Sequence, residues 1–98
     1  MFLVDMKFTN MDIVTPELTQ LHRLYLADEY KKNKMMFGGR KEPRTGGLII
    51  SNHQTKSELE QVLNSDPFIS SGAASYSITE FTPVMASEQY AHLLSENL

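Results

Sequence analysis

The stretch MMFGGRKEPRTGGLIIS, residues 35–51, decides the fold of this chain. Its first five residues predict a short strand that runs into two glycines, where the backbone can bend or approach another backbone closely. Residues 40–47 consist largely of the residue types that turns use. LIIS, residues 48–51, is apolar almost throughout, as in a strand that is contacted on both faces. The stretch therefore predicts two successive strands joined by a turn.

A strand and a helix are predicted before this stretch. Residues 2–8 alternate between apolar and mixed positions, which is the period of a strand with one strongly apolar face. Residues 16–33 have the apolar spacing of a helix, with Pro16 as its first residue and Thr15 as its N-cap. One predicted stripe of this helix contains Leu18, Leu21, Tyr25 and Leu26, with His22 inside it.

After the stretch, the order of helix and strand repeats. Residues 54–65 predict a second helix, in which Thr55 and Glu58 have the spacing of a capping box. Residues 74–84 predict a long strand, and residues 87–98 a short C-terminal helical tail. The chain is thus predicted to be an α+β protein with the ferredoxin-like order β-α-β-β-α-β.

Two helices of this length cover only one face of a four-stranded sheet. The opposite face is predicted to carry apolar side chains that need another cover, namely Ile49 or Ile50 together with Ile78 or Phe81. A matching sheet from a second chain would supply that cover. We therefore expect a homodimer or a higher homo-oligomer.

Composition excludes several classes of function. The 98 residues fit one domain, residues 1–98, and their net charge of −3 provides no basic field for nucleic acid. The sequence has no cysteine, which excludes disulfides and zinc–thiolate sites. It has no long apolar run, so no signal peptide, membrane span or membrane partner is expected, and the cytoplasm is the expected location.

His22 and Asp66 are the leading candidates for chemistry. A neutral imidazole has one donor and one acceptor, and its ordinary pKa suits proton transfer near neutral pH. A histidine on an apolar helix face is also a common core residue. If the two helices lie antiparallel, Asp66 comes near His22 and can hold one imidazole nitrogen. The alternative is an aspartate that caps the backbone around Pro67.

The other polar candidates are weaker. Arg40 and Arg44 flank a turn among glycines, where they either grip a substrate carboxylate or remain in solvent. His53 and His92 are scattered and form no metal-binding spacing with His22. No metal and no cofactor are therefore expected.

Four segments together resemble the YciI-like (YCII-related) family over about residues 2–84. They are LHRLYL, MFGGRKEPRTGGLII, SELEQVLNSDPF and YSITEFTPV, in this order. The resemblance implies a dimeric α+β barrel built from two ferredoxin-like protomers. It also implies an active-site pair of histidine and aspartate, which corresponds here to His22 in LHR and Asp66 in DPF.

The resulting hypothesis is a small cofactor-independent enzyme in which His22 and Asp66 carry out general acid–base catalysis on a small organic molecule. Isomerisation, elimination or hydrolysis would fit this pair. In the substrate site, an anionic group would be anchored by Arg40 or Arg44, and the cavity would be lined by Phe68 and Tyr25. The alternative is a non-catalytic ligand-binding or accessory module in which the pair is a structural hydrogen bond. A catalytic histidine must present one nitrogen to a cavity, whereas a structural one has both nitrogens satisfied by protein.

Overall fold

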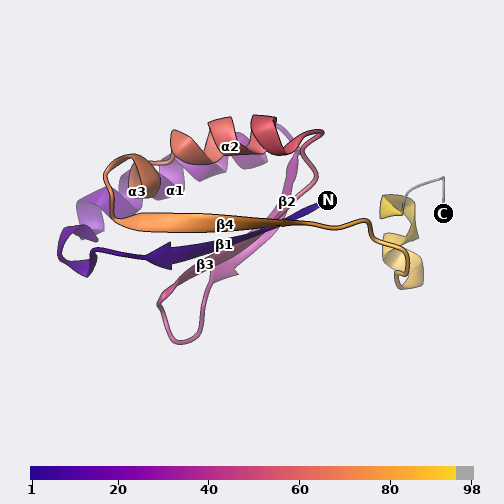
Figure 1. Ribbon diagram of the computed structural model, residues 1–98, viewed down its shortest axis with the longest axis horizontal. Coiled ribbons are helices and arrows are strands. Elements are labelled where there is room, and N and C mark those ends of the chain that lie inside the picture. The colour runs from indigo at the N-terminus through magenta and orange to yellow at the C-terminus, as the bar shows by residue number, and fades with distance from the viewer. Residues whose placement is uncertain (95–98) are drawn as a thin grey trace.

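The computed structural model describes residues 1–94 and has the predicted α+β order (Figure 1). Its elements are β1 (Phe2–Phe8), η1 (Met11–Ile13), α1 (Pro16–Tyr30), β2 (Met35–Arg40), β3 (Gly46–Ser51), α2 (Lys56–Asn64), α3 (Pro67–Ser70), β4 (Ala74–Glu80) and η2 (Glu88–Leu93). The hairpin predicted from residues 35–51 is confirmed as β2 and β3. None of the helices in this part of the chain combines the length and the apolar character needed to cross a membrane.

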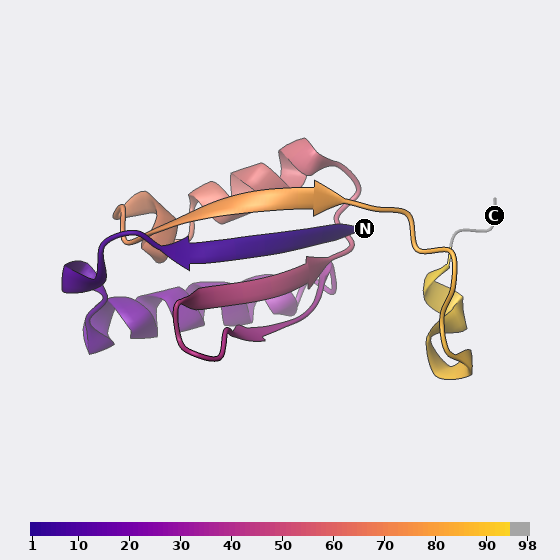
Figure 2. The same cartoon turned by 60° about the horizontal axis from the view of Figure 1, so that its bottom comes forward.

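The four strands form one antiparallel sheet in the order β2-β3-β1-β4. The strands β1 and β4 are therefore neighbours. The helix α1 connects β1 to β2, and α2 and α3 connect β3 to β4; neither pair of strands is adjacent in the sheet. The helices α1, α2 and α3 lie on the same side of the sheet, and no helix of residues 1–94 covers the other side (Figures 1 and 2).

The core lies between this sheet and the helices. Along β1, Phe2, Val4 and Met6 are buried toward the helices, whereas Asp5 and Lys7 are exposed on the other face. This alternation is the one that the apolar period of residues 2–8 predicts. The buried core as a whole contains Phe2, Val4, Met6, Met35, Ile49, Leu59, Leu63, Phe68, Ala73 and Ala74.

The face of the sheet without helices carries apolar side chains, as predicted. Ile50 lies on this outer face, while Ile49 is buried in the core, and the half-buried Ile78 packs against that core as well. Phe81 follows the last strand and is 39% exposed. In the strand register, Ile50 of β3 is aligned with Leu3 of β1 on one side and with Phe37 of β2 on the other. Leu3, Phe37, Leu48 and Ile50 together are called the outer-face cluster below.

The predicted helix caps are confirmed. The Thr15 hydroxyl accepts a hydrogen bond from the backbone N–H of Leu18 at 3.1 Å. The Thr55 hydroxyl accepts one from the N–H of Glu58, also at 3.1 Å. The carboxylate of Glu58 binds Lys34, so this side chain holds α2 to the start of β2.

Other local predictions differ from the structure. β4 ends at Glu80 rather than at residue 84, and its chain continues as an extended arm. Leu21, predicted to lie in the apolar stripe of α1, is 55% exposed. The helix turns Thr19, His22, Leu26 and Tyr30 toward the sheet, at successive spacings of three and four residues, so His22 and Leu26 of the predicted stripe face a cavity.

The C-terminal tail is helical, as predicted, but forms a short 3-10 helix, η2, in which no residue is buried. It lies beyond the end of β4, separated from the body of the molecule (Figures 1 and 2). The part of the predicted tail at residues 95–98 lies outside the described residues.

Candidate active site

Asp66 lies at the junction of α2 and α3. Pro67 disfavours helical geometry at the residue before it, and Asp66 accordingly has the extended angles φ −66° and ψ 129°. Its Oδ1 accepts a hydrogen bond from the backbone N–H of Phe68 at 2.9 Å, which caps α3. The side chain is fully buried, with an exposed fraction of 0%. A carboxylate in that position needs further polar partners.

His22 is that partner. Its Nδ1 lies 2.8 Å from Oδ1 and 2.9 Å from Oδ2 of Asp66. An ionised carboxylate only accepts hydrogen bonds, so Nδ1–H is the donor and the lone pair of the neutral ring is on Nε2. Asp66 thus both caps the local backbone and holds His22. The two roles that sequence reasoning treated as alternatives are filled by the same side chain.

Aromatic rings pack against the face of the His22 imidazole. Phe68 stacks on His22 with a centroid separation of 4.0 Å and an interplanar angle of 20°. Phe8 in turn meets Phe68 edge to face at 5.4 Å. The carboxylate fixes the direction of Nδ1 and the ring of Phe68 fixes the plane, so the direction of Nε2 is determined.

His22 borders a cavity of about 350 Å³ between α1 and the β2–β3 hairpin, with Asp66 buried behind it. The side chain of His22 is 16% exposed. Nε2 has no hydrogen-bond partner within residues 1–94, and no buried side-chain nitrogen or oxygen in this range lacks one. Nε2 is therefore open to the cavity. This is the feature expected of a catalytic rather than a structural histidine.

The predicted binding residues fall into two groups. Arg40, Arg44 and Phe68 all line the cavity. Arg44 lies over the ring of Phe8 at 5.9 Å. Tyr25 does not belong to the lining, because its hydroxyl donates to the backbone carbonyl of Val62 at 2.6 Å.

The two arginines are available to a ligand. Arg40 contacts Glu42 at 3.1 Å, but both side chains are largely exposed, and such surface pairs contribute little. Sequence reasoning did not select Arg23, which also lines the cavity and directly follows His22. It also overlooked Thr19 and Tyr30. Thr19 lies three residues before His22 and Tyr30 eight residues after it on the same helix, and this spacing places both on the face of His22.

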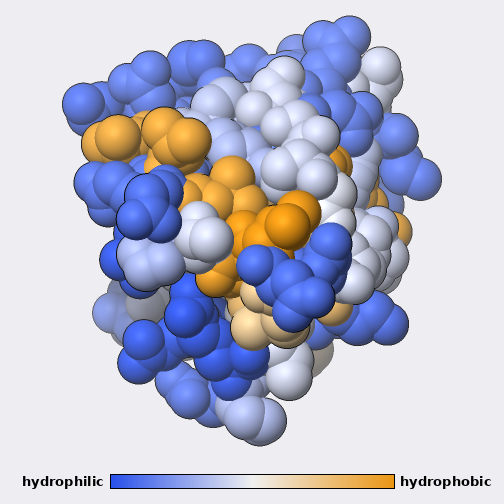
Figure 3. Space-filling view, turned by 90° about the vertical axis from the view of Figure 1, so that its left-hand side faces the viewer, coloured by the Kyte–Doolittle hydropathy of each residue, from blue (hydrophilic) through white to orange (hydrophobic). Residues whose placement is uncertain are grey.

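The cavity runs along α1, and at one end it is lined by Phe8 and by Phe68 of α3, which lies at the end of the molecule away from the C-terminal tail (Figure 1). Seen from that end, the surface is apolar in the middle and hydrophilic around it (Figure 3). One wall consists of Gly38, Gly39, Gly46 and Gly47 from the hairpin. A wall without side chains is suited to a flat ligand.

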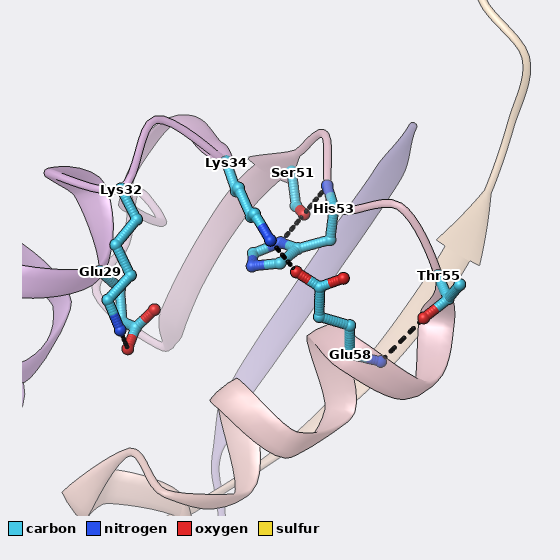
Figure 4. A network of polar contacts seen from close by, with 7 residues as sticks. All are labelled: Glu29, Lys32, Lys34, Ser51, His53, Thr55 and Glu58. Atoms are coloured by element: carbon cyan, nitrogen blue, oxygen red, sulfur yellow. Dashed lines mark hydrogen bonds and ion pairs between the residues drawn. The ribbon is translucent and has the colours of Figure 1, made fainter.

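His53 belongs to a separate polar network at the far end of the helices (Figure 4). It is buried, its Nδ1 is hydrogen-bonded to the Ser51 hydroxyl, and its own backbone N–H donates to the Ser51 oxygen at 3.1 Å. Burial lowers the pKa of His53, although the Glu58 carboxylate opposes this shift. Within residues 1–94 no group of histidine, aspartate and glutamate side chains is arranged to hold a metal ion.

The fold and the cavity together define a class of protein. It is an α+β protein with a split β-α-β-β-α-β sheet, in which a histidine held by a buried aspartate borders a small-molecule-sized cavity. More specifically, the chain belongs to the YCII-related domain family, which matches residues 7–82. No curated protein matches the chain significantly.

Among solved structures, the chain is similar to 5-chloro-2-hydroxyhydroquinone dehydrochlorinase from Burkholderia phenoliruptrix AC1100 in complex with 2,5-dihydroxybenzoquinone. The TM-score is 0.68 at 22% sequence identity, over 83% of this chain and 92% of the other. At this identity the likeness shows the fold alone. It confirms the predicted ferredoxin-like architecture.

Proposed function

We propose that this protein is an acid–base enzyme that acts on a small organic anion, with His22 as the proton-transferring group. The observation that carries the proposal is the environment of the imidazole. Nδ1 is held at 2.8 Å by a fully buried carboxylate, and Nε2 is open to a cavity. A structural hydrogen bond does not require one nitrogen to face solvent.

The proposed chemistry follows from this geometry. Nε2 takes a proton from an acidic C–H or O–H of the substrate, and the electrons of that bond move into the substrate. Asp66 stabilises the imidazolium that forms, since it lies at hydrogen-bond distance from Nδ1. In an isomerisation the proton then returns to another atom of the substrate. In an elimination a neighbouring leaving group departs with the electrons of its bond, and the imidazolium releases its proton to water.

An anionic substrate is supported by the arginines at the cavity. Arg23, Arg40 and Arg44 line it, and no acidic side chain of residues 1–94 does. Guanidinium groups bind carboxylates and other oxyanions in a bidentate manner. The glycine wall and the rings of Phe8 and Phe68 favour a flat apolar body for the same molecule.

The structural relative supports the class of reaction. A dehydrochlorinase removes hydrogen and chloride from its substrate, and the relative holds a benzoquinone with two hydroxyl groups. Elimination from an oxygenated ring is therefore the reaction to test first. A base such as His22 is what such a reaction needs.

The test is proton exchange in D2O, followed by NMR. The native protein is incubated with 2,5-dihydroxybenzoquinone and with a panel of enolisable carboxylates, and loss of the ring or α-hydrogens is timed. We expect exchange above the buffer rate for at least one compound, and a loss of about 10²–10⁴-fold in His22→Asn and Asp66→Asn. His92→Asn, a change of an exposed histidine in η2, is the matched control with an unchanged rate.

A panel that exchanges no faster than in buffer, or exchange that survives in His22→Asn, contradicts the proposal. Binding without exchange would instead support the non-catalytic ligand-binding module. Thermal shift of native protein and His22→Ala with the same panel separates binding from chemistry.

The homodimer also remains a proposal, and the outer-face cluster supports it. Phe37 is 64% exposed and Leu48 41% exposed, on a sheet face that none of the described helices covers. A second copy that packs its own sheet there would cover both. Sedimentation of Phe37→Glu should give a monomer of about 11 kDa, whereas Leu24→Glu, at a 58% exposed position on α1, should not change the native dimer. A native monomer at micromolar concentration would remove the argument.

A further inference from the structure

The cavity is elongated along α1. This helix contributes Thr19, His22, Arg23, Leu26 and Tyr30 to the lining, which are positions on one face over three turns. His22 and Tyr30 are eight residues apart, and a rise of 1.5 Å per residue separates their backbones by about 12 Å along the axis. Side chains on one helix face lean in the same direction, so much of this separation is retained at their tips.

The two ends of the cavity differ in chemistry. Arg44 lies over Phe8, which contacts Phe68, and Phe68 stacks on His22, so one arginine belongs to the His22 end. Leu26 follows His22 by one turn and gives the middle of the cavity an apolar wall. At the far end, the polar group is the phenol hydroxyl of Tyr30.

The hydroxyl of Tyr30 lies against Gly38 at this far end. A Cβ placed on Gly38 would come within 2.5 Å of the hydroxyl oxygen, so the missing side chain leaves the space that the hydroxyl occupies. No hydrogen bond joins this hydroxyl to another side chain or backbone group of residues 1–94, and it is not sealed from solvent. Burial raises the pKa of Tyr30, which keeps the group protonated. It is thus a hydrogen-bond donor at the cavity wall without a protein acceptor in this range.

We infer that the cavity binds a ligand longer than a single ring, with an anionic head at His22 and Arg44, an apolar body along Leu26 and a neutral carbonyl or ether oxygen that accepts a hydrogen bond from Tyr30. This inference rests on the proposed function for the placement of the head. A single six-membered ring held at His22 does not span the separation to Tyr30. The hydroxyl of Tyr30 at the far end therefore indicates a ligand that is longer than the dihydroxybenzoquinone in the structural relative.

The test compares three carboxylates by calorimetric or NMR titration. Two are a matched pair: 4′-acetylbiphenyl-4-carboxylate has a carbonyl oxygen at its far end, and 4′-ethylbiphenyl-4-carboxylate has none. The third compound, benzoate, contains only the anionic head group and one ring. The native protein should bind the acetyl compound about threefold to tenfold more tightly than the ethyl compound, as expected for one hydrogen bond. Tyr30→Phe should remove this preference, and the affinity for benzoate should stay the same.

Tyr25→Phe is the matched control, because its hydroxyl bonds to Val62 outside the cavity lining. It should keep the preference for the acetyl compound. A native protein without the preference, or a Tyr30→Phe variant that keeps it, overturns the inference. If benzoate still binds and Arg44→Gln weakens it, the anion site at His22 stands while the longer ligand is wrong. If none of the three compounds binds, the inference fails together with the proposed anion site.

Discussion

Asp66→Asn separates the two roles of the buried carboxylate. The amide oxygen can still accept the hydrogen bond from the backbone N–H of Phe68, so the cap of α3 is kept. The charge opposite Nδ1 of His22 is lost, and with it a contact of 2.8 and 2.9 Å to two carboxylate oxygens. Hydrogen bonds to a charged group contribute about 1.5–3 kcal/mol and neutral ones about 0.5–1.5 kcal/mol. The expected destabilisation is therefore about 1–2 kcal/mol.

The same change should alter the tautomer of His22. An amide nitrogen facing Nδ1 donates to it, which moves the ring proton to Nε2 and removes the base from the cavity. In the native protein the proton of the neutral ring is on Nδ1, because the carboxylate only accepts. The variant should thus be folded and inactive in proton exchange.

Two measurements check this prediction. Urea denaturation and thermal melting give the stability, and for a domain of this size about 1–2 kcal/mol corresponds to a fall in Tm of about 5–15 °C. Nitrogen-15 NMR of the imidazole distinguishes the tautomers. Asp28→Asn, an exposed aspartate on the same helix as His22, is the control and should change neither quantity. An Asp66→Asn protein with native stability and an unchanged tautomer would refute the role given to Asp66.

Three further changes test other parts of the structure. Gly46→Ala should destabilise the protein by more than about 2 kcal/mol, or prevent folding, because its Cβ would lie 1.9 Å from the carbonyl oxygen of Met6; a native melting curve would contradict this. Thr55→Ala should cost about 1 kcal/mol in urea denaturation through loss of the α2 cap, and Thr55→Ser should restore it. Burial lowers the pKa of His53, so the unfolded chain binds a proton there more readily than the folded one, and the free energy of unfolding should fall as the pH drops from about 6.5 to 5. His53→Asn, which keeps a hydrogen-bonding side chain beside the Ser51 hydroxyl, should flatten that fall in a urea series, and an unchanged slope would show that another group is responsible.

The order of the elements was predictable because local signals mark it. Thr15 and Thr55 cap their helices as their spacing indicates, and the strand periods are those of half-buried strands. The face that α1 turns to the sheet was not predictable in detail. Within the predicted stripe, His22 and Leu26 face the cavity, whereas Leu21 is exposed and Tyr25 turns its hydroxyl toward α2. Apolar character alone does not distinguish two adjacent stripes of one helix.

The pairing of His22 with Asp66 required a contact between residues 44 positions apart, which no local signal specifies. The geometry of the tripeptide Asp66–Pro67–Phe68 explains why the site and the fold depend on each other. Pro67 keeps Asp66 extended, which ends α2 and starts α3 at the carboxylate. The single turn of α3 then places Phe68 on the face of the same imidazole that Asp66 holds at its edge. Both contacts to His22 therefore come from one short segment, and a shift of that segment would change the direction and the plane of the ring together. That coupling favours a rigid position for Nε2, which is what proton transfer to a ligand in the cavity requires.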